Sequence, residues 1–212
     1  MHGDDLHHHH DEDPHAPIEN KDDLGHYALM TLAVRDLLVE KGVFSADDVR
    51  ATVEAMDARS PAQGARIVAR AWTDPNYKAR LLADGSAGAK ELGIDVGPTH
   101  LVVVENTDSV HNLIVCTLCS CYPRWVLGLP PDWYKSRSYR SRAVREPRAV
   151  LAEFGTAVPD DVTVRVHDST ADMRYLVLPR RPQGTEGWSE DQLAAIATRD
   201  SMIGVTVPKV TA

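Results

Sequence analysis

Residues 113–121 read LIVCTLCSC, and this stretch decides the fold because it joins a strand to a cluster of thiols. Its first three residues are a short apolar run of the kind that forms a buried strand. All three cysteines of the chain, Cys116, Cys119 and Cys121, follow directly. An odd number of cysteines in so short a span does not form a disulfide framework. In a reducing compartment, clustered thiols more often bind a metal or take part in catalysis.

The spacing C-x-x-C-x-C argues against several common kinds of cysteine site. A structural zinc site needs four ligands, usually from two pairs, and an iron–sulfur cluster also needs four. The sequence has no second pair: His100, His111 and His167 are isolated, and an isolated histidine is more often hydrogen-bonded in or near the core. A thioredoxin-like site would use two cysteines at a helix start. On spacing alone, coincidental buried thiols stay open as an alternative.

Three thiols on one short loop can form an octahedral site with one position left free. Between Cys119 and Cys121 the backbone must pass close beneath the metal, so the amide nitrogens of Ser120 and Cys121 come within bonding reach. A strongly acidic trivalent ion can displace the protons of these amides, which gives sulfur and nitrogen donors from one peptide. Such donors favour low-spin cobalt or iron over zinc. The open position is the usual requirement for metal-assisted hydration.

Outward from the cluster, hydrophobic period and turn residues predict a mixture of strands and helices. Apolar or alternating runs predict strands over 101–104, 113–115, 162–167, 175–178 and 203–207. Helical spacing and capping signals predict helices over 24–42, 45–56, 60–72, 74–85, 147–155 and 189–198. This mixture, without an internal repeat, indicates a layered α+β fold.

The chain divides into three parts. Residues 1–23 are rich in His and Asp and lack an apolar pattern, which predicts a disordered tail. Residues 24–94 hold several short helices with little continuous apolar surface, which indicates a helical arm that packs on a partner. Residues 95–212 form the predicted catalytic domain around the thiols. The tail holds most histidines of the chain, namely His2, His7, His8, His9, His10 and His15. The tail is interpreted as a solvated leader or part of an expression tag, with weak metal capture or delivery as the alternative.

Composition and charge exclude several classes of protein. With 212 residues, 43% hydrophobic and 25% charged, the chain is typical of a soluble globular protein. No apolar run reaches the roughly 18 residues of a membrane span, and the acidic N-terminus is no signal peptide, so the default expectation is a cytoplasmic protein without membrane contact. A net charge of −8 argues against nucleic-acid binding. The basic run from Lys135 to Arg148 is either a solvated face or a subunit interface.

Several longer motifs accompany the cysteine cluster. They are VVVENT (102–107), VHN (110–112), LGLPPDWYK (127–135), YRSR (139–142), GTEGW (184–188) and TRDSMIGV (198–205). With these motifs the sequence resembles the nitrile hydratase α-subunit family and its relative, the metal-bearing γ subunit of thiocyanate hydrolase, over about residues 24–208. The combination is highly specific, so coincidence becomes a minor alternative.

The resemblance implies a low-spin Co(III) centre, with Fe(III) as the alternative. The residue after the first cysteine is Thr in cobalt members of the family and Ser in iron members, and here it is Thr117. By motif position, Cys116, Cys119, Ser120 and Cys121 hold the metal, with Cys116 as a thiolate. Cys119 would be oxidised to cysteine sulfinic acid and Cys121 to cysteine sulfenic acid. The fold implied is a four-layer α/β/β/α arrangement with mixed sheets and a helical N-terminal arm.

The implied reaction adds water to the carbon–nitrogen triple bond of a nitrile and yields an amide. The sulfenate oxygen of Cys121 is a candidate nucleophile, and Ser120 and Arg124 are further candidate catalytic residues; attack on a metal-polarised nitrile is the other route. The implied partners are β-type subunits whose arginines hold the oxidised cysteines, in one branch within a three-subunit assembly, and an activator protein that inserts the metal. Two alternatives stay open: a thiocyanate hydrolase subunit with the same metal, and a non-catalytic carrier subunit that awaits its ion.

Three positions depart from the nitrile hydratase pattern. Arg124 stands where that family has a Trp near the substrate pocket, and Trp125 stands where a Pro follows it. Gly97, which lies 19 residues before the first cysteine, replaces a substrate-pocket Gln. Thiocyanate hydrolase also has Arg at the position of Arg124. These changes predict a wider and more polar pocket for a bulky or polar nitrile or an anionic substrate, unless Arg124 only faces a partner subunit.

Overall fold

The computed structural model describes residues 25–210, so the tail predicted over 1–23 lies outside the described part. The helices in the first half are α1 (His26–Glu40), α2 (Ala46–Asp57), α3 (Ala62–Thr73), α4 (Pro75–Ala83) and α5 (Gly85–Glu91). Those in the second half are α6 (Arg124–Leu127), α7 (Asp132–Lys135), α8 (Arg137–Arg145), α9 (Pro147–Glu153), α10 (Glu190–Ile196) and α11 (Arg199–Ile203). The strands are β1 (His100–Glu105), β2 (Val110–Val115), β3 (Thr163–Asp168) and β4 (Met173–Leu178).

Several helices begin at the polar caps that the sequence predicts. At α2 the Asp48 amide donates to the Ser45 hydroxyl, while the Asp48 carboxylate accepts from the Ser45 amide, which makes a capping box. Asp74 caps α4, with Pro75 at the first helical position. A second capping box opens α10. The predictions that correspond to α1, α2, α3, α9 and α10 are therefore confirmed.

The four strands form two parallel pairs, β1 with β4 and β2 with β3. A parallel pair needs a long crossover, and α6 to α9 supply it between β2 and β3. The prediction of mixed sheets was wrong for the described strands, because an apolar pattern identifies a strand but not the direction of its neighbour. The register places Val115 opposite Asp168, so the ends of β2 and β3 meet beside the first cysteine.

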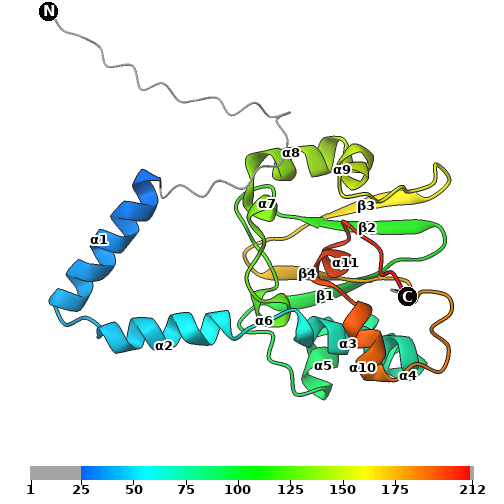
Figure 1. Cartoon of the computed structure of the whole chain (residues 1–212), viewed down its shortest axis with the longest axis horizontal. Coiled ribbons are helices and arrows are strands. Elements are labelled where there is room, and N and C mark those ends of the chain that lie inside the picture. Colours follow the sequence, from blue (N-terminus) through cyan, green and yellow to red (C-terminus); the bar gives the residue numbers. More distant parts are fainter. Residues whose placement is uncertain (1–24, 211–212) are drawn as a thin grey trace, which may run out of the picture.

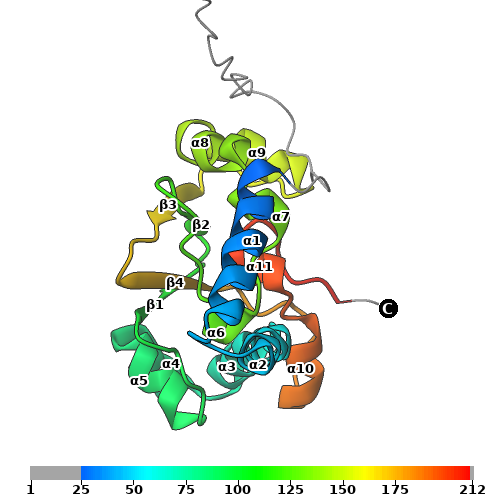
Figure 2. The ribbon, with the colours of Figure 1, turned by 90° about the vertical axis from the view of Figure 1, so that its left-hand side faces the viewer.

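The strands lie at the centre of the body, between two groups of helices. Figures 1 and 2 show α8 and α9 at one end, beside β2 and β3, and α3, α4, α5 and α10 at the other, beside β1 and β4. The largest fully buried apolar side chains come from both groups and from the strands; they include Ile67, Leu81, Leu113, Leu151 and Leu176. This arrangement is consistent with the predicted α+β class.

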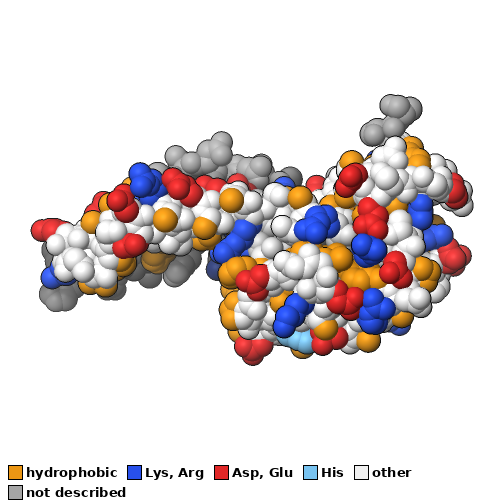
Figure 3. All heavy atoms as spheres, turned by 90° about the horizontal axis from the view of Figure 1, so that it is seen from below, with side chains coloured by type: hydrophobic (Ala, Val, Ile, Leu, Met, Phe, Trp, Pro, Cys, Tyr) orange, Lys and Arg blue, Asp and Glu red, His pale blue; other side chains and the backbone are white. Residues whose placement is uncertain are grey.

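The first two helices have no core contacts of their own. Neither α1 nor α2 has a buried residue, whereas α3 buries one complete face. Figure 3 shows this arm projecting from the body, with apolar side chains exposed among charged ones. The most exposed large apolar residues of the arm include Tyr27, Val34, Val43 and Val53. An arm that extends to residue 94 stays a prediction, since α3 to α5 contribute side chains to the core.

One predicted strand is absent, and one helix was not predicted. The run over 203–207 is not a strand, because α11 ends at Gly204, where φ is +95°. Ile203 and Val205 are buried against the body, which produces a strand-like pattern without strand pairing. The helix predicted over 74–85 is confirmed as α4, which ends at Ala83. The sequence analysis missed α5, which begins at Gly85 and is capped by the Asp84 side chain.

The described helices are short. The longest, α1, has 15 residues. No helix within residues 25–210 is both long and apolar enough to cross a membrane.

Candidate metal centre

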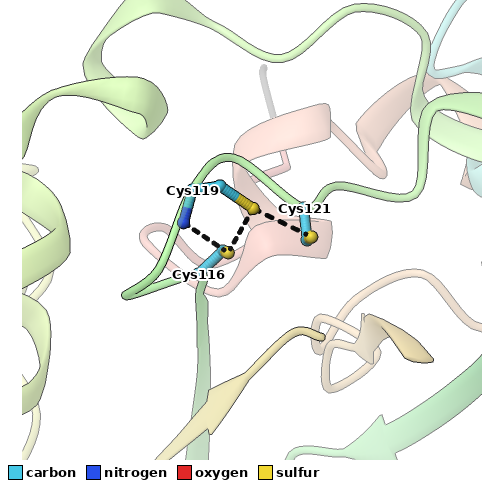
Figure 4. A group of neighbouring side chains, drawn as sticks. All are labelled: Cys116, Cys119 and Cys121. Carbon is cyan, nitrogen blue, oxygen red and sulfur yellow. Dashed lines mark hydrogen bonds between the residues drawn. The ribbon is translucent and has the colours of Figure 1, made fainter. Parts of the chain in front are cut away.

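Strand β2 delivers the three thiols to one side of a short loop, as Figure 4 shows. Cys116 is buried directly after the strand, Cys121 is partly buried and Cys119 is exposed. The Sγ atom of Cys119 lies 3.5 Å from that of Cys116 and 3.2 Å from that of Cys121. All three sulfur atoms lie within 4.8 Å of one another, which is compatible with shared binding of one ion.

Backbone amides of the loop also face the sulfur atoms. The Cys119 amide donates to Cys116 Sγ at 3.3 Å. Hydrogen bonds from the Cys121 and Cys116 thiols, and then from the Ser120 and Cys121 amides, lower the pKa of the Cys119 thiol below its ordinary value. Burial raises the pKa of the Cys121 thiol to about 12. The residues present therefore fit a soft, strongly acidic metal ion, since thiolates and adjacent amide nitrogens converge on one place.

Side chains from α7 and α8 hold the carbonyl groups of the loop and of the strand before it. The Tyr134 hydroxyl donates to the Cys121 carbonyl at 2.9 Å, and Arg140 donates to the Cys119 carbonyl at 2.8 Å. The buried Tyr139 hydroxyl donates to the Ile114 carbonyl at 2.6 Å. The loop thus has a rigid support on its α8 side, where the sequence shows the motif that contains Tyr139 and Arg140.

On its other side the loop is held by the end of β3. The Asp168 carboxylate accepts from the Thr117 amide at 2.9 Å and from the Thr117 hydroxyl at 2.5 Å. Thr117 follows Cys116 directly, so Asp168 fixes the backbone where it leaves the strand. The sequence analysis did not identify Asp168, because its partner lies 51 residues away and no local signal links the two.

A pocket of about 350 Å³ opens beside the thiols. It is lined by Pro98, Thr99, Cys119, Ser120, Cys121, Tyr122, Arg124, Trp125 and Arg174. Arg124 therefore lines a pocket beside the thiols, and its role in the reaction stays a prediction. Arg174 of β4 is a further lining residue, which the sequence did not indicate. Among the described residues that line this pocket, none is Asp or Glu, so its two guanidinium groups make it electropositive.

The expected widening of the pocket stays a prediction, but the space beside Gly97 is not empty. A Cβ atom at this position would lie 2.1 Å from Nε1 of Trp125. The indole of Trp125 therefore fills the space that a side chain at position 97 would need.

The isolated histidines are hydrogen-bonded apart from the thiols. His111 Nε2 lies 2.7 Å from the Gly204 carbonyl, and His167 Nε2 lies 2.8 Å from Oδ1 of Asn112. Burial is the main cause that lowers the pKa of His111 and of His167 below the ordinary value. His100 lies on the surface near Ser86. The interpretation of these histidines as hydrogen-bonded residues is confirmed for His111 and His167.

The basic run on α8 and α9 has structural partners. Arg142 is buried and pairs with Glu146 and Glu153. Arg148 donates to carbonyl groups of the loop before β3, including that of Val158 at 2.9 Å. The interpretation of the basic run as a purely solvated face is therefore wrong for Arg142, which forms ion pairs, and for Arg140, which supports the thiol loop. The interpretation as a subunit interface stays a prediction.

Comparison with known proteins agrees with this geometry. The family model described as nitrile hydratase, alpha chain, matches residues 25–206. The chain belongs to this family. Among curated nitrile hydratase alpha subunits, the low-molecular weight cobalt-containing protein of Rhodococcus rhodochrous is 53% identical over 178 residues, covering 83% of this chain and 86% of the relative. The thiocyanate hydrolase subunit gamma of Thiobacillus thioparus is 45% identical over 205 residues, covering 91% and 84%.

Solved structures similar to this chain also include both thiocyanate hydrolases and nitrile hydratases. A recombinant thiocyanate hydrolase with partially modified cobalt centres superposes with a TM-score of 0.81 and 45% identity, covering 88% of this chain and 92% of that chain. A double mutant of the Fe-type nitrile hydratase of Comamonas testosteroni Ni1 gives 0.82 and 44%, covering 88% and 94%. Both cobalt and iron proteins thus occur among the structural neighbours.

Proposed function

We propose that the chain is the metal-bearing α-type subunit of a cobalt nitrile hydratase, which hydrates a nitrile to the corresponding amide together with a β-type subunit. The observation that carries the proposal is the convergence of three thiols and two backbone amides on one place beside a pocket. Cobalt-containing relatives at 51–53% identity support cobalt over iron, as does Thr117 after the first cysteine. The ligands would be Cys116, Cys119, Cys121 and the amide nitrogens of Ser120 and Cys121.

A trivalent cobalt ion held there would supply a Lewis-acidic centre with one open position. The chain's own residues would bind this ion, supply the candidate nucleophile and orient the substrate. Cys116, buried at the end of β2, stays a thiolate, while Cys119 and Cys121 are oxidised to the sulfinic and sulfenic acids. The sulfenate oxygen of Cys121, which lines the pocket, would be the candidate nucleophile toward the nitrile carbon, and water would then regenerate the sulfenate and release the amide. Attack of water on a metal-polarised nitrile is the other route. Ser120 and Arg124 would orient the substrate. Arginines of the β-type subunit hold the oxidised cysteines, and an activator protein inserts the metal.

The proposal extends to the architecture. The body would have four layers in the order α/β/β/α, supported by the helices on either side of the strand pairs in Figure 1. Residues 24–94 would form the arm toward the β-type subunit, and residues 95–212 the metal-bearing domain.

Metal analysis of the complex tests the proposal. The chain co-expressed with its partner subunits should contain stoichiometric cobalt, turn over a nitrile, and show oxidation at Cys119 and Cys121 by mass spectrometry. Replacement of Cys116, Cys119 or Cys121 by Ser should abolish turnover while the chain remains folded, since the loop lies outside the regular core elements. Substantial turnover in all three variants, or background cobalt in an active complex, would refute it.

A second candidate, hydrolysis of thiocyanate at the same centre, is favoured by the charge of the pocket. Arg124 and Arg174 face it without a lining carboxylate, which suits a small anion better than a neutral nitrile. The test compares release of ammonia and carbonyl sulfide from thiocyanate with amide formation from nitriles, on the same cobalt-loaded complex.

A non-catalytic carrier subunit is the third candidate. It is a subunit that awaits insertion of its ion, and it predicts that cobalt never exceeds background in an active complex. Metal analysis of the chain with and without partner subunits therefore separates it from the first two.

A further inference from the structure

Trp125 lines the pocket beside the thiols, and its indole packs directly against Gly97. Gly97 has φ of +70°, a conformation that favours glycine. A Cβ atom built on it would lie 2.1, 2.4 and 2.6 Å from three atoms of the Trp125 indole. The indole therefore occupies the space of any side chain at position 97, and it does so beside Cys119 and Cys121, whose pocket it lines.

The segment that joins the arm to the body holds this indole from another direction. The guanidinium carbon of Arg59 lies 3.8 Å from the centre of the Trp125 ring, a cation–π contact. The backbone of Arg59 in turn packs against Gly128, where an added Cβ would lie 2.5 Å from the Arg59 carbonyl oxygen. Trp125 lies within α6 and Gly128 directly follows this helix, so Arg59 contacts both and the indole has little freedom to leave its position.

We propose that Trp125 is a specificity-determining residue that restricts the pocket to compact substrates. This inference rests on the proposed function, because it assigns a substrate to the pocket beside the three thiols. A rigid indole in the wall takes up the volume that a larger substituent would need, while the small end of a substrate can still reach Cys121. The expected preference is for short aliphatic nitriles or an anion of similar size over aromatic nitriles.

Kinetics of the assembled, cobalt-loaded complex test the steric part. The measured quantity is the ratio of kcat/KM for benzonitrile to kcat/KM for propionitrile. W125A should raise this ratio by about tenfold or more, since an extra group in a pocket changes discrimination by about 10–200-fold. W125F, which keeps an aromatic wall, should stay near the native ratio. W188A serves as the control, because Trp188 is also part-exposed and does not line this pocket. An unchanged ratio in W125A would overturn the inference.

Thermal unfolding of the same complexes tests the pairing without reference to turnover. G97A should lower the unfolding temperature by several degrees, because the new Cβ meets the indole and the backbone is strained. In G97A/W125A the clash is absent, so the loss should be smaller than the sum of the two single losses. Additive losses would show that the two residues do not compete for the same space, which would overturn the inference.

The two levels of failure are distinguishable. If the native cobalt-loaded complex hydrates no nitrile and hydrolyses no thiocyanate, the proposed function fails, and with it the substrate assignment. If the native complex is active and W125A keeps the native ratio, the proposed function stands and only the role of Trp125 is refuted.

Discussion

The thiol loop is held by single residues from three other segments of the chain, namely α7, α8 and the end of β3. Tyr134 and Arg140 hold its carbonyl groups from one side, and Asp168 holds Thr117 from the other. The backbone of this short loop does little to stabilise its own conformation. The shape of the loop before metal binding therefore depends on these side-chain contacts. Groups that orient metal ligands in this way are usually as important as the ligands.

Loss of the Asp168 contact is expected to weaken metal binding. D168A removes both acceptors of Thr117 and should lower cobalt affinity or activity by about tenfold or more, the usual range for a group behind a metal ligand. D168N keeps the shape and one acceptor, so its loss should be smaller. Cobalt content per chain, measured by elemental analysis after dialysis, checks this. D160A is the control, since Asp160 is an exposed carboxylate away from the pocket; equal cobalt in D168A and D160A would contradict the prediction.

At the scale of elements, α11 and β2 are joined by one close backbone approach. Gly204 ends α11 with φ of +95°, and a Cβ there would lie 2.1 Å from the Asn112 carbonyl oxygen. The Gly204 carbonyl also accepts a hydrogen bond from Nε2 of His111 at 2.7 Å. This contact holds α11 on the strand that leads to the thiols.

A side chain at this approach is expected to destabilise the fold. G204A should lower the free energy of unfolding by about 1–3 kcal/mol from backbone strain alone, with a further loss from the clash. G155A is the matched control, because Gly155 also has positive φ, at +74°, but an added Cβ there meets nothing within 4 Å. Urea unfolding of the two variants checks the difference, and equal losses would argue against the close approach.

At the scale of the whole molecule, stability is coupled to pH through the buried His111 and the half-buried His167. Burial lowers the pKa of His111 and of His167 in the folded chain. The unfolded chain therefore takes up protons first as the pH falls. Stability from these groups is fully present above the ordinary histidine pKa of about 6.5, and it is lost as the pH falls below that value toward their lower folded values.

The unfolding temperature should therefore decrease between roughly pH 7 and pH 5. The double variant H111Q/H167Q should show a flatter dependence over this range, even if it is less stable at pH 7. H100N is the control, because His100 is exposed. The measurement is thermal unfolding at several pH values, and an unchanged slope in the double variant would contradict the explanation.

The arm is the second feature at this scale. Its exposed apolar side chains have no partner surface within residues 25–210 that buries them. Replacement of Tyr27, Val34 and Leu37 together by Ser should reduce co-purification with partner subunits and leave the unfolding temperature of the isolated chain nearly unchanged. The control is V207S, since Val207 is similarly exposed but lies on the body. Normal assembly of the triple variant would show that α1 does not contact a partner.

Local chemistry alone determined the three-thiol loop and most helix starts. The cysteines are adjacent in sequence, and caps such as Ser45 and Asp74 act on amides two or three residues away, so no distant contact is needed to identify them. Tertiary structure decided which strands pair, how Asp168 meets Thr117 and that Trp125 fills the space beside Gly97. These contacts join segments that are far apart in the sequence and are brought together only when the whole core packs. The residues next to a single position in the sequence do not indicate which distant segment it will contact.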